Sequence, residues 1–329
     1  MIPPREDVTA SEETGTLSAG TKDVVLGSEE PGPFVLEVDP EQKYKAKDFK
    51  ICSFARPHMR AFHYSWWSFF IAFFDWFSIA PMLPEVKKSL GLTKREIWLS
   101  NIVGVGGDIV MRFVFGALTD KFGPRILMGV VLIFTSIPTA CTGLVNNFVG
   151  LCLVRLFIGF GGASFVMCQC WTTGMFTKEI VGTANALVGG WGNVGGGAAQ
   201  LVIGTALFPL FRDVIFSNAE DPAEKAWRVV CIVPAVVTLL TGALVIFTSE
   251  DCPEGNYKDL IKEGKMTPVS ASVSFRQGAV EPNTWLLFIQ YGCCFGIEIT
   301  MNNAATTYFV DRFDLRTETA AAIASIFGS

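Results

Sequence analysis

The sequence predicts an all-α membrane protein, and three observations support that class. Half of the 329 residues are hydrophobic and only 17% are charged, whereas an average soluble domain has roughly a quarter charged residues. The mean hydropathy is +0.41. Apolar runs of about twenty residues recur along the chain, and that length lets a helix cross the ~30 Å hydrocarbon core of a bilayer.

Residues 1–55 precede the apolar runs and are predicted to be a disordered cytoplasmic segment. The first forty are rich in Ser, Thr, Gly, Pro and Glu and offer little apolar surface to bury. They lack a basic stretch followed by an apolar one, so the sequence argues against a secretory signal peptide.

Seven membrane-spanning helices are expected next, and an eighth begins near Ala320. We place the seven at residues 62–84, 98–119, 126–146, 149–173, 182–211, 228–248 and 284–310. The connecting loops are short except for a polar stretch at 249–283. The sequence therefore predicts a six-helix half at 56–248, a cytoplasmic linker at 249–283 and the start of a second half at 284–329.

The chain ends inside the eighth apolar stretch. A helix that stopped there would leave backbone carbonyls unsatisfied in lipid, which is costly. We therefore expect the sequence to be truncated at Ser329 and the complete protein to have more spans.

Basic residues predict a cytoplasmic N-terminus, because loops on that side carry an excess of Lys and Arg. Six basic residues lie between positions 43 and 60, and four more lie in the 249–283 linker. Four basic residues in the first outer loop, at 87–95, weaken this assignment.

Composition also disfavours several classes of function. The net charge of −5 makes a nucleic-acid partner unattractive, and nine irregularly spaced cysteines argue against a disulfide framework or a zinc site. The chain shows no nucleophile–base set, so an enzyme is not expected, and neither is a cofactor or a metal.

Two short motifs mark the second and fourth spans. The first is "GALTDKFGPRI", residues 116–126, in which Gly116 allows close helix approach and Gly123 makes a tight turn before Arg125. Asp120 is placed to meet another helix's N-terminal dipole or an arginine. The second is "RLFIGFGG", residues 155–162. Together they resemble the signature loop and the Arg-x-x-x-Gly-x-Gly motif of the major facilitator superfamily, which implies that fold.

Arg112 lies within the second span and is a candidate binding residue. An arginine inside the membrane is costly and marks a functional site by default. Its planar guanidinium suits a planar oxyanion. The alternative is a structural pair with Asp108, four residues earlier on the same helix face.

The fifth span carries seven glycines between Gly189 and Gly204. Gly192 and Gly196 form a Gly-x-x-x-Gly pair, the spacing that lets membrane helices pack backbone to backbone. Packing does not explain Asn193, because an amide in an apolar environment is costly unless it forms a hydrogen bond.

The seventh span has two pairs of residues that each share a helix face. Tyr291 and Phe295 form one pair, and they either pack or contact a ligand. Glu298 and Asn302 form the other, and Glu298 is either a proton carrier or a polar residue lining a water path.

Four stretches are similar to the nitrate/nitrite porter family of the major facilitator superfamily, and most of all to its eukaryotic high-affinity transporters. They are "HMRAFHYSWWSFFIAFF" (58–74), "CQCWTTGMF" (168–176), "ALVGGWGNVGGGAAQL" (186–201) and "CFGIEITMNN" (294–303). The third resembles the nitrate signature of that family, with Gly189, Gly192, Gly195, Gly196 and Gly197.

The resemblance implies a set of substrate-binding residues. Arg112 matches the family's nitrate-binding arginine, Phe165 an aromatic that packs on the flat anion, and Asn193 the signature asparagine beside it. Tyr291 and Phe295 match aromatics of the seventh span. The family's second binding arginine would fall beyond the end of this sequence.

The resemblance also implies a function: high-affinity import of nitrate, with nitrite as a further substrate, across the plasma membrane by proton-coupled alternating access. Nitrate, protons and the lipid bilayer are the implied partners, and some members of the family need a single-span accessory protein. The alternatives are a nitrate sensor without transport and a transporter of another small anion.

Two carboxylates depart from the family pattern. Asp75 has no assigned role. Asp108 either neutralises part of the charge of Arg112 and so weakens anion binding, or takes part in proton coupling.

Overall fold

The computed structural model describes residues 34–266 and 271–327, and its helices confirm the predicted class. Seven helical stretches in these residues are long and apolar enough to cross a membrane: His58–Ser89, Lys94–Phe122, Pro124–Leu144, Phe148–Met175, Val181–Ile215, Pro222–Thr248 and Pro282–Phe313. Each contains or overlaps one predicted span. The disorder predicted for residues 1–33 lies outside the described residues.

Breaks divide several of the stretches into shorter elements. The first three comprise α1 (His58–Trp76), η1 (Ala80–Met82), α2 (Leu83–Ser89), α3 (Lys94–Phe122), α4 (Pro124–Ala140) and η2 (Cys141–Leu144). The next three comprise α5 (Phe148–Gly159), η3 (Phe160–Ala163), α6 (Ser164–Met175), α7 (Val181–Ala199), the π-helical η4 (Gln200–Leu207) and η5 (Leu210–Ile215), α8 (Pro222–Val230) and α9 (Ile232–Thr248). The remainder are α10 (Tyr257–Lys262), α11 (Ala271–Val280), α12 (Pro282–Phe313) and α13 (Thr317–Ser325).

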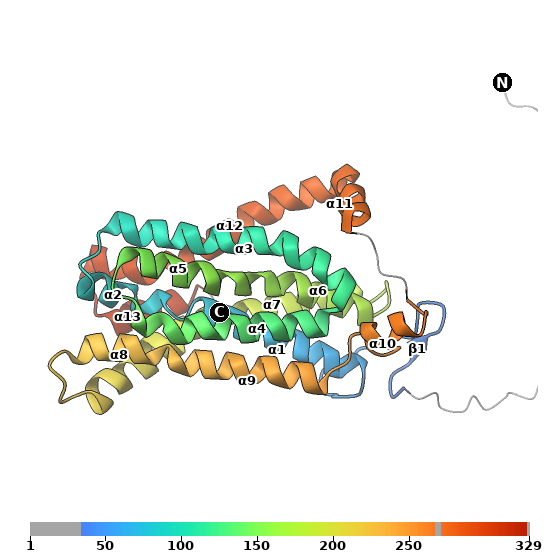
Figure 1. Ribbon diagram of the computed structural model, residues 1–329, viewed down its shortest axis with the longest axis horizontal. Helices are drawn as coiled ribbons and strands as arrows, with labels where there is room; N and C mark the ends of the chain where they lie inside the picture. The colour runs from blue at the N-terminus through green and yellow to red at the C-terminus, as the bar shows by residue number, and fades with distance from the viewer. Residues whose placement is uncertain (1–33, 267–270, 328–329) are drawn as a thin grey trace, which may run out of the picture. The chain divides into compact units, whose positions relative to one another are not determined.

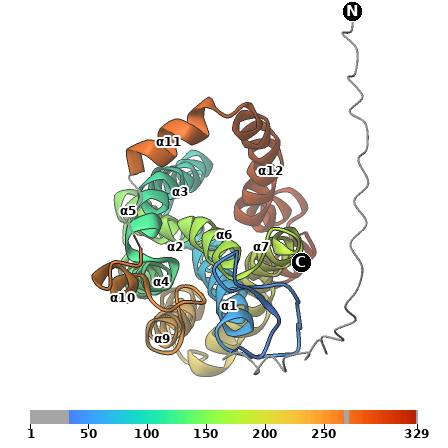
Figure 2. The ribbon, with the colours of Figure 1, turned by 90° about the vertical axis from the view of Figure 1, so that its right-hand side faces the viewer.

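The long helices run side by side (Figure 1). Within the first half, α1 packs along α7, α4 along α9, and α3 along α5. The second half begins with α12, which contacts η1, α2 and α13, and α13 packs on η4. Seen along the helices in Figure 2, α11 bridges the ends of α3 and α12.

The glycine-rich helix α7 packs against α1 through glycines that leave no room for a side chain. A Cβ on Gly192 would overlap the ring of Phe69, and one on Gly195 would overlap the carbonyl oxygen of Phe70. Gly196 faces both α1 and α12, because its added Cβ would lie 3.1 Å from Phe77 and from Asn302. The close packing predicted from the glycines is therefore present, and its tightest backbone contact is at Gly195.

Residues 34–55 do not show the disorder that the sequence predicted. Strands β1 (Val38–Asp39) and β2 (Lys45–Ala46) pair antiparallel. The amide of Thr177 donates a hydrogen bond to the carbonyl of Ala46 at 3.0 Å, and the ring of Phe49 packs on Phe62 of α1 at 4.8 Å. Because Leu36, Ala46 and Phe49 supply apolar surface that covers the ends of α1 and α6, this segment orders on the bundle.

Candidate functional site

The Arg112 side chain lies between two aromatic rings from other helices. Its guanidinium carbon is 5.5 Å from the ring centroid of Phe165 on α6 and 4.8 Å from that of Phe295 on α12. Both distances fall within the range in which an aromatic face attracts a cation. The structure therefore brings together three of the predicted binding residues from three helices.

Tyr291 completes an aromatic stack beside the arginine. Its ring stacks on Phe165 at 5.4 Å and on Phe295 at 5.0 Å, with interplanar angles of 17° and 19°. The rings of Phe69 and Phe73 on α1 contact Phe165 and Phe295 from behind, at 5.5 and 6.2 Å. Flat, near-parallel rings of this kind form a wall suited to a planar ligand.

Asp108 pairs with Arg112, as the structural alternative predicted. Arg112 Nε donates to both carboxylate oxygens of Asp108, at 2.8 and 3.0 Å, and Asp108 is 2% exposed. This contact uses one N–H only. The Nη2 nitrogen of Arg112 is buried and has no hydrogen-bond partner among the described residues. A buried donor without an acceptor costs about 1–3 kcal/mol, so the arginine pairs with Asp108 and still offers a donor to a ligand.

The two remaining predicted polar residues are not joined to this cluster by a hydrogen bond. Asn193 lies on α7, and its Oδ1 is buried without a partner in the described part of the chain. Gly189 of the same helix lies near the cluster, since an added Cβ there would lie 3.9 Å from Phe165. Glu298 is half-buried on α12.

A cavity of about 600 Å³ extends from Arg112 along α3. It is lined by Arg112, Phe113, Gly116, Ala117 and Asp120 of α3, Phe275, Gly278 and Ala279 of α11, and Thr284, Trp285 and Phe288 of α12. The cavity therefore connects Arg112 with the end of α3 that carries the "GALTDKFGPRI" motif.

The motif loop docks on an aspartate that the sequence analysis missed. Gly123 has φ +87°, and a Cβ there would overlap the carboxylate of Asp251. That carboxylate accepts from the backbone amide of Arg125 at 3.0 Å, and Arg125 Nη1 donates to the carbonyl of Ile246 at 2.6 Å. Burial raises the pKa of Asp251, and the nearby Arg125 guanidinium opposes that rise. Asp120 has no hydrogen bond or ion pair with any described residue.

Arg155 was also missed as a candidate, although it opens the quoted "RLFIGFGG" motif. It is 4% exposed and donates to Asn101 of α3 and, at 2.6 Å, to Asn303 of α12. Within residues 34–266 and 271–327 it has no carboxylate partner. Arg155 thus connects α5 to both α3 and α12 through hydrogen bonds to uncharged acceptors.

A second polar contact joins α7 and η4 to α12. Gln200 donates to the backbone carbonyl of Asn302 at 2.6 Å and accepts from Thr306 at 2.7 Å. The side-chain amide of Asn302 is buried, and neither of its polar atoms has a partner in the described residues. The sequence predicts that Asn302 and Glu298 share a helix face, but it does not indicate that α12 contacts Gly196 of α7.

Asp75 lies apart from the Arg112 cluster. It is buried on α1, and its Oδ2 accepts from Thr139 of α4 at 2.9 Å. Its Oδ1 has no partner in the described residues.

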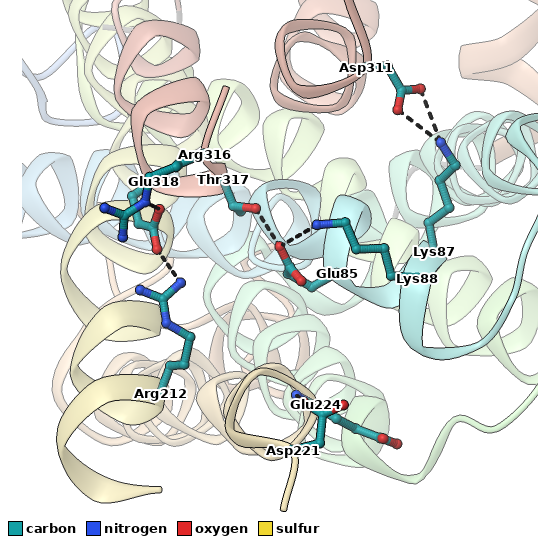
Figure 3. A network of polar contacts seen from close by, with 10 residues as sticks. All are labelled: Glu85, Lys87, Lys88, Arg212, Asp221, Glu224, Asp311, Arg316, Thr317 and Glu318. Atoms are coloured by element: carbon teal, nitrogen blue, oxygen red, sulfur yellow. Dashed lines mark hydrogen bonds and ion pairs between the residues drawn. The ribbon is translucent and has the colours of Figure 1, made fainter. Parts of the chain in front are cut away.

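Polar contacts connect the two halves at the end of the bundle away from Asp120. Figure 3 shows those that join Asp311 to Lys87, Thr317 to Glu85 and Arg212 to Glu318. Asp311 of α12 binds Lys87 at 2.9 Å and Lys94 at 3.1 Å. Thr317 of α13 donates to Glu85 at 2.6 Å. Another contact joins Arg212 of η5 to Glu318 of α13. We call these four contacts the Asp311 network; they hold α12 and α13 to α2, α3 and η5.

Known proteins with similar sequences are membrane transporters. Residues 65–329 match the family model described as "Major Facilitator Superfamily". The chain is 37% identical over 298 residues to "High affinity nitrate transporter 2.5" of Arabidopsis thaliana, covering 91% of this chain and 58% of that protein. It is 35% identical to "Nitrate transporter 2.1" of Chlamydomonas reinhardtii, covering 91% and 53%. It is 30% identical to "Nitrate/nitrite transporter NrtP" of Nostoc punctiforme, covering 67% and 43%.

The chain thus spans about half the length of the curated relatives that it matches. Among solved structures, a bacterial homolog of the human lysosomal transporter Spinster, crystallised in an inward-facing, unoccupied conformation, has a TM-score of 0.62 at 16% identity. The match covers 82% of this chain and 60% of that one, and it shows a shared fold. The family model, the seven spans and this fold agree with the resemblance found in the sequence: the chain belongs to the major facilitator superfamily.

Proposed function

We propose that this protein imports nitrate, and nitrite as a second substrate, across the plasma membrane, with its N-terminus in the cytoplasm. The observation that carries the proposal is the buried, unpartnered Nη2 of Arg112 between two aromatic faces. A flat anion can accept from that nitrogen while it lies against the rings of Phe165 and Phe295. The names of the relatives, which are nitrate and nitrite transporters, support nitrate as the anion.

Transport would proceed by alternating access between the two halves around this site. The described geometry fits a state open to the cytoplasm, because a cavity leads from Arg112 to the Asp120 end while the Asp311 network links the halves at the other end. In this proposal Asn193 and Tyr291 line the anion site with Arg112.

Proton coupling supplies the driving force in this proposal. An inside-negative potential opposes anion entry by about 2.3 kcal/mol per charge for each 100 mV. Cotransport of protons offsets that cost. Glu298 is the candidate proton carrier, and the half-buried position of its side chain on α12 is compatible with that role.

The test is nitrate binding and uptake by the full-length protein in proteoliposomes, with Arg112→Lys as the variant. Lysine keeps the charge but loses the planar fork and the ring stacking. We expect the apparent affinity to fall about tenfold or more, since a hydrogen bond to a charged group is worth about 1.5–3 kcal/mol. Arg95→Lys, on the exposed start of the same helix, is the matched control and should behave as wild type.

Equal uptake by wild type and Arg112→Lys would refute the site assignment. Nitrate binding without flux would favour a sensor. Uptake of another small anion that nitrate does not compete with would favour a different substrate.

A further inference from the structure

We infer that Asp108 couples proton binding to anion binding: its carboxylate neutralises Arg112 in the empty site, and its protonation accompanies the arrival of the anion. This inference rests on the proposed function and assigns the proton that binds with the anion to Asp108 in place of Glu298. Asp108 is here a positioning residue, because it acts on the anion through Arg112.

The geometry lets the anion and Asp108 share the arginine. Both oxygens of Asp108 accept from the single Nε–H of Arg112, at 2.8 and 3.0 Å. Nη2 is buried and unpartnered among the described residues. An anion can therefore accept a hydrogen bond from Nη2 without displacing Asp108. The anion and the Asp108 carboxylate then compete for the positive charge of Arg112 and not for the same N–H group.

Asp108 is 2% exposed, and Arg112 is its hydrogen-bonding partner in the part of the chain that the structure describes. An added Cβ on Gly162 of η3 would overlap the carboxylate and the Trp76 ring of α1, so both elements pack directly against it. Neither of these neighbours carries a charge.

Two other titratable groups face the pair. The Tyr291 hydroxyl of α12 interacts with Arg112 and Asp108 and also with Glu298, and the Cys168 thiol of α6 interacts with Arg112. A tyrosine hydroxyl and a cysteine thiol are both mainly uncharged at neutral pH. Among the described residues, the charge at the centre of the site is therefore that of one arginine and one carboxylate, which cancel.

Charge balance links the two ligands. Adding an anion to a buried, neutral ion pair leaves an uncompensated negative charge in a poorly solvated place, which is unfavourable. If Asp108 takes up a proton with the anion, Arg112 and the anion balance each other. Because linkage is reciprocal, a bound proton then strengthens anion binding and a bound anion strengthens proton binding.

The consequence is a pH-dependent affinity for nitrate. When one proton enters with each anion, the apparent affinity falls by about tenfold for each pH unit above the range in which Asp108 is already protonated. In Asp108→Asn the side chain keeps its shape and an oxygen acceptor for Nε, but it carries no charge at any pH. We expect this variant to bind nitrate with a nearly flat pH profile and more tightly than wild type at high pH.

The experiment uses the purified full-length protein and nitrate as the probe. Titration calorimetry from about pH 5.5 to 8.5 gives the affinity, and proton uptake on nitrate addition in weakly buffered solution gives the number of protons bound. Asp75→Asn is the matched control, because Asp75 is also buried but bonds to Thr139 and not to an arginine. Asp108→Ser is a second variant, with a smaller uncharged side chain, for use if the Asp108→Asn protein does not fold.

We expect proton uptake with wild type and Asp75→Asn, and little or none with Asp108→Asn. A wild-type pH profile in both Asp108 variants would overturn the inference while the proposed function stands. Loss of the profile in Glu298→Gln but not in the Asp108 variants would also overturn it. Failure of wild type to bind nitrate at any pH would overturn the proposed function and this inference with it.

Discussion

Among the individual residues, Arg112 shows how a membrane-embedded charge is kept in a defined orientation. Asp108 fixes Nε from its own helix, while Phe165 and Phe295 hold the guanidinium plane from two others. An arginine that is free to rotate would lose entropy on binding a ligand, whereas this one is already ordered. In the proposed site, the rings would therefore contribute to anion binding even where they do not touch the anion.

We therefore predict that nitrate affinity depends more on an aromatic ring beside Arg112 than on one elsewhere on α12. Phe295→Leu keeps an apolar side chain but removes the aromatic face 4.8 Å from the guanidinium. We expect nitrate affinity to fall several-fold, since such a contact is worth about 0.5–2 kcal/mol. Phe313→Leu, at the exposed end of α12, is the control. Equal nitrate affinities in the two variants, measured by calorimetry, would contradict the argument.

Among the helices, α7 shows why a glycine-rich membrane helix is stable. Its glycines at 192 and 195 meet the ring of Phe69 and the backbone of Phe70, so the helix axis lies close to α1 along its length. A backbone carbonyl cannot move aside as a side chain can. Close approach thus compensates for the low helix propensity of glycine.

We predict that Gly195→Ala destabilises the protein and Gly190→Ala does not. A methyl group at 195 would overlap the Phe70 carbonyl, and overpacking of this kind costs about 1–3 kcal/mol. The space around Gly190 is open, so alanine there should be neutral or stabilise the helix by about 0.5–1 kcal/mol. Thermal unfolding in detergent measures both, and a lower Tm for Gly190→Ala than for Gly195→Ala would refute this account of α7.

The sequence predicted the helices well because their signals are local. Apolar runs place the spans, and Thr93 with Glu96 forms the capping box that starts α3. Pairing of distant residues has no such signal. Residues 34–55 are ordered because the ring of Phe49 packs on Phe62 and Phe176. The π-helical η4 begins at Gln200, whose side-chain amide donates a hydrogen bond to a backbone carbonyl of α12.

The same distinction explains the candidate site. Arg112 was found because an arginine inside a membrane span is costly, and Phe165, Tyr291 and Phe295 were matched through the resemblance to a family. Asp251 was missed, and so was the contact that Asn302 makes, since each matters only through a contact with a distant segment: the loop at Gly123 and the helix at Gly196. Asp120, in contrast, stands in a recognised motif, yet the partner expected for it is not among the described residues.

For the whole molecule, the Asp311 network joins the two halves at one end of the bundle. Two lysines of the first half hold Asp311 at the end of α12, and Glu318 and Thr317 of α13 bind Arg212 and Glu85. These contacts cross from one half to the other. In alternating access such contacts must break when that end opens, so their strength biases the equilibrium between the two states.

We predict that Asp311→Asn shifts the full-length protein toward the state open at the Asp311 end. The change removes both ion pairs to Lys87 and Lys94 and leaves the anion site untouched. Exposed ion pairs are worth about 0.2–1 kcal/mol each, so the population should shift by a few-fold. Spin labels placed across that end would report it as a larger share of long distances. Asp314→Asn is the control, because Asp314 is exposed, has no ion pair with any described residue, and has a left-handed backbone that asparagine also adopts. If the two variants gave the same distance distribution as wild type, the ion pairs of Asp311 would be surface contacts that do not affect the opening of that end.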